Sequence, residues 1–380
     1  MFSASYPFYQ PGQAALLPTP ERVGALPTYT GRNVVIAFVD SGFYPHPDLG
    51  RRVLVHVDAS TNHVIEQPPN GYTISDQSWH GQMTTVIAAG DGSMSGGRYR
   101  GIASEALLVL VKVSTPRGQV KERDILRGLR WIKDAHRRLN IRIVNLSVGG
   151  DFVNGDPEHP LHRIVRQLVA DGVVVVAAVG NRAAPIVVPP ASAAEVIAVG
   201  GLNDHNTRDS SHWTLYHSNY GTAWDGSPKP DLIAPAEWIA GPIMPDTSVA
   251  REARWLGSLL AIRDASDVGR ILDRAYADLG LPRAAAQQPD DNVFAMIQAR
   301  INAHKIVDAH HQFVDGTSVA APIVSSVIAQ MIEVNPRLSP GTICQILKQT
   351  AQPLPEFDRS RQGAGALRAA AAVEAARAAR

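Results

Sequence analysis

The sequence predicts an α/β protein with a doubly wound, mostly parallel sheet that is flanked by helices and carries a helical insertion. Short, mostly apolar runs rich in valine and isoleucine recur along the chain, and such runs are typical of strands buried on both faces of a parallel sheet. Between them lie segments whose apolar residues recur every three or four positions, as in amphipathic helices. This alternation of strand and helix indicates a doubly wound fold.

The first predicted strand covers residues 34–39 (VVIAFV) and follows an irregular segment that contains five prolines. Similar apolar runs predict four further strands at residues 107–113, 141–147, 173–179 and 196–200. In sheets of this kind, binding and catalytic side chains gather at the carboxyl ends of the strands. The residues that directly follow these runs are therefore candidate site residues.

Two segments between the strands have clear helical character. Residues 122–139 place Ile125, Leu129 and Ile132 at helical spacing. Residues 161–171 have Pro160 at their start and Gly172 just past their end, the positions that these two residue types favour at helix termini. We expect both helices to pack against the sheet.

Residues 239–313 depart from the strand–helix alternation. Their apolar spacing predicts three helices, at residues 249–263, 267–279 and 291–307, and residues 282–290 (PRAAAQQPD) predict a mobile loop. The predicted organisation is therefore an N-terminal extension (residues 1–31), an α/β domain made of residues 32–238 and 314–380, and a helical insertion (residues 239–313).

Composition excludes several classes of function. The chain has 36 Lys and Arg against 35 Asp and Glu, so it lacks the basic excess expected for a nucleic-acid or anionic-membrane partner. No apolar run reaches the ~18 residues of a membrane span. The single cysteine, Cys344, excludes an intramolecular disulfide framework. We expect no nucleic-acid and no membrane partner.

Four short motifs carry the candidate chemistry. Asp40-Ser41-Gly42 follows the first strand, His80-Gly81 opens a helical stretch, and Asn181 follows Gly180 after another strand. Each of these three is weak alone, because Asp, His and Asn are common in turns and caps. The fourth, from Gly316 to Pro322 (GTSVAAP), is specific: it places Ser318 at a helix start, where free N–H groups and the helix dipole favour a developing negative charge.

The order Asp40, His80, Ser318 resembles that of the subtilisin-like serine proteases, the subtilases, and differs from the orders of two other Ser-His-Asp groups. Surrounding segments match this family too, over residues 33–239 and 314–376. In chain order, these segments are VDSG (39–42), HPDL (46–49), AAG (88–90), YRGIA (99–103), NLSVGG (145–150), AAVGN (177–181), KPDLIAP (229–235) and the serine motif (316–322).

The resemblance implies acyl transfer through a covalent serine intermediate in a catalytic domain of residues 32–238 and 314–380. Ser318 would attack the scissile carbonyl, His80 would move the proton and Asp40 would orient the imidazole. The Asn181 amide and the Ser318 N–H would form the oxyanion hole. An extended peptide or protein substrate would pair with Leu146, Ser147, Val148 and Gly149, and Ala178 and Gly180 resemble the wall of the pocket for the residue before the cut.

Some features depart from the family pattern. Gln82 stands where threonine is usual, which leaves the hydrogen bonding around His80 open, and the insertion separates Asn181 from Ser318. Asp48 matches a calcium ligand of some members, but a turn or cap role explains it equally well. We therefore expect no required cofactor and assign no metal site, with calcium left open.

The missing signal-peptide pattern and disulfides favour a cytoplasmic protein, with a processed secreted chain as the alternative.

Two other functions remain compatible with these motifs. In a peptide ligase or macrocyclase, an amine would resolve the same acyl-enzyme, and the insertion would shield the site from water. A catalytically silent module would use the groove only to hold peptide, although the intact set of Asp40, His80, Asn181 and Ser318 argues against that. The insertion is also a candidate surface for a regulatory partner.

Overall fold

A computed structural model describes residues 2–10, 15–68, 71–72, 74–262, 264 and 266–379. The chain divides into two compact units. The sheet unit consists of Pro18–Glu237 and Asp315–Arg380, and the helical unit consists of Met1–Leu17 and Trp238–Val314. Each unit is therefore built from two separate stretches of the chain.

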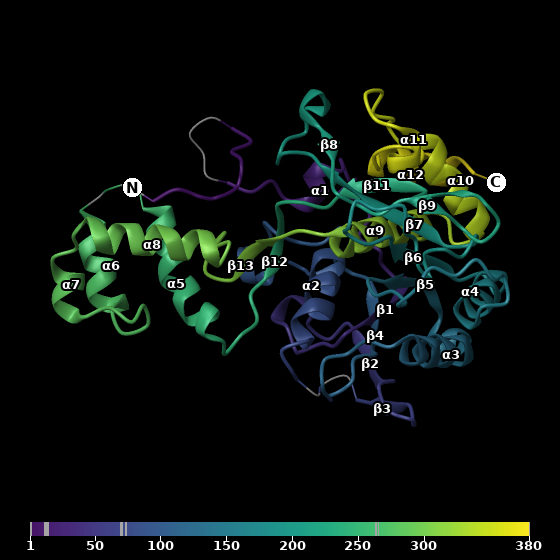
Figure 1. Ribbon diagram of the computed structural model, residues 1–380, viewed down its shortest axis with the longest axis horizontal. Coiled ribbons are helices and arrows are strands. Elements are labelled where there is room, and N and C mark those ends of the chain that lie inside the picture. Colours follow the sequence, from purple (N-terminus) through teal and green to yellow (C-terminus); the bar gives the residue numbers. More distant parts are fainter. Residues whose placement is uncertain are drawn as a thin grey trace. The chain divides into compact units, whose positions relative to one another are not determined.

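A central sheet organises the sheet unit (Figure 1). Its strands run in the order β11-β7-β6-β5-β1-β4-β2-β3, and β8 pairs with β7. All neighbours pair in parallel except β2 with β3 and β7 with β8. The strands are β1 (Val35–Asp40), β2 (Val53–Asp58), β3 (Ile65–Gln67), β4 (Leu107–Lys112), β5 (Ile141–Leu146), β6 (Val174–Ala178), β7 (Ile197–Asn203), β8 (Thr214–Leu215) and β11 (Leu232–Pro235). The predicted mostly parallel sheet is confirmed.

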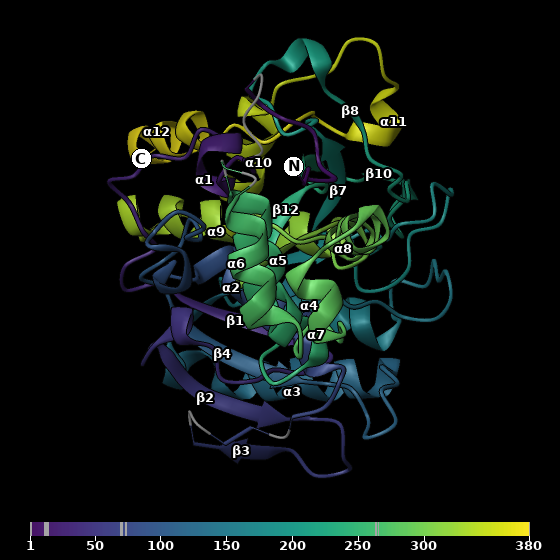
Figure 2. The same ribbon diagram turned by 90° about the vertical axis from the view of Figure 1, so that its left-hand side faces the viewer.

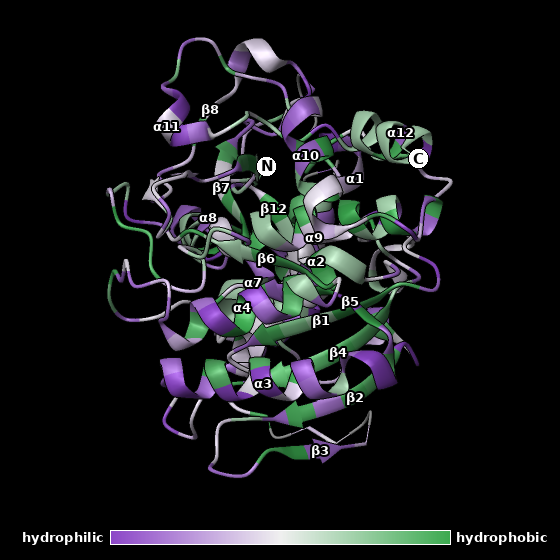
Figure 3. Cartoon of the chain, turned by 90° about the vertical axis from the view of Figure 1, so that its right-hand side faces the viewer, coloured by the Kyte–Doolittle hydropathy of each residue, from purple (hydrophilic) through white to green (hydrophobic). Residues whose placement is uncertain are grey.

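Helices cover both faces of this sheet. Successive residues of β1 point to opposite faces, and Val35, Ala37 and Val39 share one core cluster with Ile125 and its neighbours in α3 (Glu122–Leu139) and with residues of α4 (Pro160–Ala170). The remaining helices of the unit are α1 (Thr19–Arg22), α2 (Ser78–Ala89), α9 (Thr317–Val334), α10 (Pro340–Thr350), α11 (Arg359–Gln362) and α12 (Ala369–Ala378). In Figure 3, β1, β4 and β5 are hydrophobic in colour, whereas α3 alternates between the two colours, as an amphipathic helix should.

The helix α9 is apolar because it is part of the core. It contacts β5, β6, β7 and β11, and most of its residues are fully buried. Among the described residues it is the one helix with the length and hydropathy of a membrane span, and 83% of that stretch is buried within the protein. Burial against the sheet accounts for this composition.

The strand β2 was not predicted from the sequence. His56 and Asp58 interrupt its apolar run, yet both are buried. The ring nitrogen Nδ1 of His56 lies 2.5 Å from the carbonyl of Gly71, and Lys112 binds Asp58 at 3.0 Å. Buried polar side chains are tolerated when they form such hydrogen bonds. His56 and Asp58 are therefore compatible with a buried strand.

The helical unit has its own apolar core. It contains α5 (Ser248–Ala261), α6 (Asp267–Ala275), α7 (Arg283–Gln287) and α8 (Asp291–Ala303), and the antiparallel pair β12 (Ile239–Pro242) and β13 (His311–Val314). Figure 2 shows these helices packed together. Their inner faces bury Leu256, Leu272, Ile297 and other apolar residues in one cluster. The N-terminal residues join this unit, because Phe2 stacks on Phe294 at 5.7 Å and Tyr6 lies edge-on to Phe313 at 5.9 Å between ring centroids.

The helices of this unit agree with the predicted ones in place, though residue 263, the predicted end of the first, lies outside the described residues. The predicted loop at residues 282–290 is wrong in part, because it contains the short helix α7. Three consecutive alanines have high helix propensity, and Ala286 is buried in the core.

The remaining short elements, in the sheet unit, are the pair β9 (Gly221–Thr222) and β10 (Pro228–Lys229) and the 3₁₀ turns Pro47–Leu49, Ser93–Ser95 and Ser210–His212.

Candidate active site

The candidate residues lie at the ends of secondary-structure elements of the sheet unit. Asp40 is the last residue of β1, His80 lies in the first turn of α2, and Ser318 is the second residue of α9. Asn181 lies just beyond the end of β6. Since β1, β5 and β6 are parallel neighbours, their carboxyl ends open on one edge of the sheet, which is where sites form in doubly wound folds.

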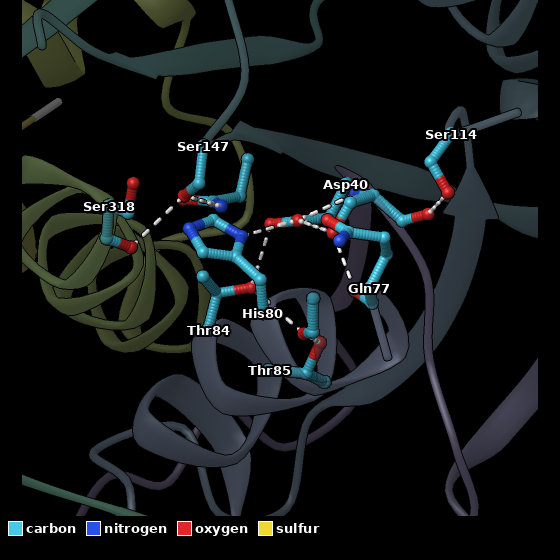
Figure 4. Close-up of polar contacts among 11 residues, drawn as sticks. Asp40, Gln77, His80, Thr84, Thr85, Ser114, Ser147 and Ser318 are labelled. Carbon is cyan, nitrogen blue, oxygen red and sulfur yellow. Dashed lines mark hydrogen bonds and ion pairs between the residues drawn. The ribbon is translucent and has the colours of Figure 1, made fainter. Parts of the chain in front are cut away.

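The half-buried His80 and the buried Asp40 form a hydrogen-bonded pair (Figure 4). His80 Nδ1 lies 2.6 Å from Asp40 Oδ1, the Asp40 side chain is 1% exposed and the His80 side chain is 32% exposed. The bond places the proton on Nδ1 and leaves Nε2 as the free basic nitrogen. Burial lowers the pKa of His80, but the charge and hydrogen bond of Asp40 outweigh burial, and the pKa is raised above its usual value.

Three donors besides His80 surround the Asp40 carboxylate. The backbone N–H of Ser41 donates to Oδ1 at 2.6 Å. The Ser41 hydroxyl is 3.2 Å from that oxygen but only 2.7 Å from the Gln77 carbonyl, so its proton is better placed for Gln77. Thr84 Oγ1 lies 3.2 Å from Oδ2. Thr84 is a site residue that the sequence reasoning missed, although its position one helical turn after His80 placed it on the same face of α2.

The structure shows which hydrogen bond Gln82 forms near His80. Its side chain is fully buried, and its Oε1 accepts a hydrogen bond from the Tyr44 backbone N–H at 3.3 Å. Gln82 thus ties α2 to the segment after β1 rather than contacting His80. The hydrogen bond between His80 and Asp40 is present despite this departure from the family pattern.

Ser318 is held at the start of α9 by contacts from β5 and the residue after it. Ser147 Oγ donates to the Ser318 carbonyl at 3.1 Å and accepts from Asn145 Nδ2 at 3.1 Å. Asn145 also accepts from Ser325 of α9 at 3.0 Å. In the view of Figure 4 the His80 ring lies between Ser318 and Asp40. Among the described residues no hydrogen bond joins the Ser318 hydroxyl to His80; such bonds often tighten only when substrate is bound.

Asn181 is oriented by the residue that precedes Ser318. Its Oδ1 accepts from the Thr317 backbone N–H at 2.8 Å and from Thr317 Oγ1 at 2.9 Å. This leaves Nδ2 as the outward donor. A Cβ placed on Gly316 would lie 3.4 Å from Asn181 Nδ2 and 3.7 Å from the Ser318 backbone nitrogen, and Gly316 has a φ of +135°. Both donors therefore border the same small space, which only glycine leaves open.

The predicted substrate segment extends from the end of β5. Leu146 ends the strand and Ser147 contacts Ser318, whereas the backbone groups of Val148 and Gly149 form no hydrogen bond with any described residue. The chain is fixed again at Gly150, whose N–H donates to the Pro189 carbonyl at 2.7 Å. Unpaired backbone of this kind is suited to pairing with an extended peptide.

The predicted pocket wall lies at the end of β6. Ala178 is the last residue of β6, and Gly180 has a φ of +100°. A Cβ on Gly180 would come within 2.6 Å of Asn219 Nδ2, and Asn219 accepts from the Arg182 backbone N–H at 2.8 Å. Asn219 therefore supports this wall. The sequence offered no signal for it, because it belongs to a segment without regular structure.

The two oxygens of the Asp48 carboxylate, the candidate calcium ligand, differ in their surroundings. Asp48 is fully buried, and its Oδ1 accepts from Ser93 Oγ at 2.8 Å and from the Met94 N–H at 2.9 Å. Its Oδ2 is buried and has no hydrogen-bond partner among the described residues, so calcium binding at Asp48 stays open. Within the described ranges no cluster of three or more His, Cys, Asp or Glu residues could hold a metal ion.

The chain is similar to known proteins over most of its length. A family model described as the subtilase family matches residues 31–368. The serine protease AprX of Bacillus subtilis (strain 168) is 29% identical over 350 residues, which are 90% of this chain and 66% of AprX. The chain thus spans slightly less than two thirds of that relative.

Solved structures share the fold. The protease domain of PatA, solved as a mutant, has a TM-score of 0.61 at 21% identity and covers 93% of this chain and 98% of its own. The prenylagaramide maturation protease PagA has a TM-score of 0.60 at 19% identity, with 94% of this chain and 98% of its own covered.

Proposed function

Because the chain belongs to the subtilase family, we propose that it is a serine endopeptidase that hydrolyses peptide bonds through Asp40, His80 and Ser318. The observation that carries the proposal is the 2.6 Å contact between His80 Nδ1 and Asp40 Oδ1. The two residues are forty positions apart in the sequence, and their pairing leaves Nε2 free to act as a base. The protein AprX, which is similar over most of this chain, is itself a serine protease by name.

The proposed reaction proceeds in two halves. Ser318 Oγ attacks the scissile carbonyl while His80 Nε2 takes its proton, and His80 then returns the proton to the leaving amine. Asp40 keeps the proton on Nδ1 and stabilises the imidazolium that forms. Water, activated by the same histidine, releases the acid product from the acyl-enzyme. No step requires a metal ion or an organic cofactor.

Charge that develops on the carbonyl oxygen would be met by two N–H donors. Asn181 Nδ2 and the Ser318 N–H border the space beside Gly316, and the two bonds from Thr317 fix the Asn181 amide before substrate arrives. Donors that are already oriented stabilise the transition state without a reorganisation cost. Asn181 is therefore the proposed oxyanion residue.

The substrate is proposed to be an extended peptide that pairs with Val148 and Gly149. Main-chain pairing accepts many sequences, so selectivity falls to side-chain pockets. Ala178 and Gly180 would line the pocket for the residue before the cut, with the Asn219 amide packed beside Gly180.

Aminolysis of the same acyl-enzyme is the second candidate. An amine of the substrate would then replace water, and the product would be a ligated or cyclic peptide. The shared fold with PagA, titled a maturation protease for prenylagaramide, is the observation that keeps this candidate in view. The two outcomes differ in the product and not in the residues that form the acyl-enzyme.

One experiment separates the candidates. The full chain is treated with a fluorophosphonate probe, and a peptide mixture is followed by mass spectrometry. Labelling and turnover are measured on separate samples. Labelling of Ser318 together with fragments whose summed masses exceed that of the substrate by one water supports the endopeptidase. Labelling together with ligated or cyclic products supports the ligase. A folded sample that neither labels nor turns over peptide would overturn both and leave a silent binding module. Ser318→Ala is the control for the site of labelling.

A further inference from the structure

The two oxygens of the Asp40 carboxylate have unequal surroundings. Oδ1 receives the His80 ring at 2.6 Å and the Ser41 N–H at 2.6 Å, with the Ser41 hydroxyl at 3.2 Å. Oδ2 has one donor among the described residues, Thr84 Oγ1 at 3.2 Å. Asp40 and Thr84 are both fully buried, so water cannot readily replace this donor.

The close approach of α2 to β1 brings Thr84 to this oxygen. Gly81 lies so near the end of β1 that a Cβ on it would come 2.9 Å from Asp40 Cβ. Thr84 Oγ1 is also 2.9 Å from the Gly81 carbonyl, a common bond for threonine inside a helix. The single hydroxyl proton of Thr84 therefore has two possible acceptors. One is the Gly81 carbonyl within the helix, and the other is Oδ2 of Asp40, a residue of the proposed triad.

We propose that Thr84 is a positioning residue that fixes the rotation of the Asp40 carboxylate and, through Asp40, the orientation of His80. The inference rests on the proposed function of Asp40 and His80. Rotation about the Cβ–Cγ bond moves both oxygens, so the donors on Oδ1 restrain it, and the Thr84 hydroxyl on Oδ2 adds a second restraint on the opposite side of the carboxylate. Thr84 itself touches no substrate.

Thr85 is a matched control on the same helix. It is equally buried, and its Oγ1 donates to the same Gly81 carbonyl at 2.8 Å. Unlike Thr84, it makes no hydrogen bond to Asp40 within the part of the chain that is described. Thr85→Val thus removes a buried hydroxyl and a helix back-bond, but leaves the carboxylate untouched.

The test compares Thr84→Val, Thr84→Ser and Thr85→Val in the full chain. We measure kcat and KM for a peptide substrate against pH, and the pKa of His80 by histidine-selective NMR. Thr84→Val should lower kcat by roughly 10- to 100-fold, as for small misplacements of a catalytic group, with KM nearly unchanged. Because Asp40 is the charged neighbour that raises the pKa of His80, a loosened carboxylate should lower that pKa. Thr84→Ser should restore both values, and Thr85→Val should match the wild type.

The outcomes distinguish this inference from the proposed function. Equal kcat and equal His80 pKa in Thr84→Val and Thr85→Val overturn the positioning role, even if the wild type is an active protease. A wild type that neither labels nor hydrolyses peptide overturns the proposed function; the His80 pKa in the variants still decides the role of Thr84. If Thr84→Val does not fold, Thr84→Ala gives the same comparison without the extra methyl group.

Discussion

The sheet unit and the helical unit use polar side chains in different ways. In the sheet unit, Asp40, His80 and Ser318 lie at element ends, where they face one another rather than stabilise those ends. In the helical unit, polar groups serve the helices themselves. Asp290 caps α8 through the Val293 N–H at 2.9 Å, and Trp255 Nε1 donates to Asp278 at 2.6 Å. We therefore expect substitutions of these three site residues to cost activity, and substitutions in the helical unit to cost stability.

The largest expected effect comes from Ser318→Ala. It removes the proposed nucleophile, and turnover of a peptide substrate should fall by roughly 10⁶, the loss known for the nucleophile of a subtilisin. The thermal midpoint should stay close to that of the wild type. Residual turnover within tenfold of the wild type would place the nucleophile elsewhere and erase the contrast between the two units.

A loss of about 10⁴ in kcat is expected for Asp40→Asn, because the wrong imidazole tautomer is then favoured. The wild-type pH profile belongs to the same test. Protonated His80 cannot accept a proton, and Asp40 raises the pKa of His80 above 6.5. Activity should therefore fall as pH decreases, with a midpoint above 6.5 in kcat/KM. A wild-type midpoint well below that value would contradict the charged pair.

Asn181→Asp should cost about 10²–10³ in kcat, the range known for losing the asparagine donor of a subtilisin. The aspartate keeps an acceptor for the two bonds from Thr317 but replaces the donor with a negative oxygen. KM should change little. Steady-state kinetics that show a raised KM and an unchanged kcat would indicate a substrate-binding role instead.

The smallest effect on activity is expected in the helical unit. Leu272 is fully buried in its core, so Leu272→Ala should lower the free energy of unfolding of that unit by ~2–5 kcal/mol. The rate of Ser318 labelling by a small fluorophosphonate should not change. The exposed neighbour Arg274 supplies the control, Arg274→Ala. Hydrogen exchange measures the stability of the unit; a parallel loss of labelling would show that the two units are energetically coupled.

The sequence predicted most of the fold because most of its strands are largely apolar and helices such as α3 have apolar residues at helical spacing. The strand β2 was missed because its buried polar residues, His56 and Asp58, find partners only in the folded chain. The short helix α7 was taken for a loop because two prolines frame three alanines.

The site was predictable where a residue belongs to a motif. Asp40, His80, Asn181 and Ser318 stand in recognisable segments, but their roles remain predictions. Thr84 and Asn219 carry no motif, and their places depend on how closely α2 approaches β1 and on how a loop returns to Gly180. Tertiary contacts of this kind produce no periodic pattern in the sequence from which they could be predicted.

Because both units are discontinuous in sequence, the parts of the proposed active site are synthesised at different times. During synthesis, Asp40 and His80 leave the ribosome long before α9, and about 75 residues of the insertion come between the β6 region and Ser318. At 5–20 residues per second this adds roughly 4–15 seconds. Until α9 has emerged, the sheet lacks its central covering helix and the chain lacks its proposed nucleophile. If Ser318 is the nucleophile as proposed, the nascent chain therefore stays inactive until the insertion has been made.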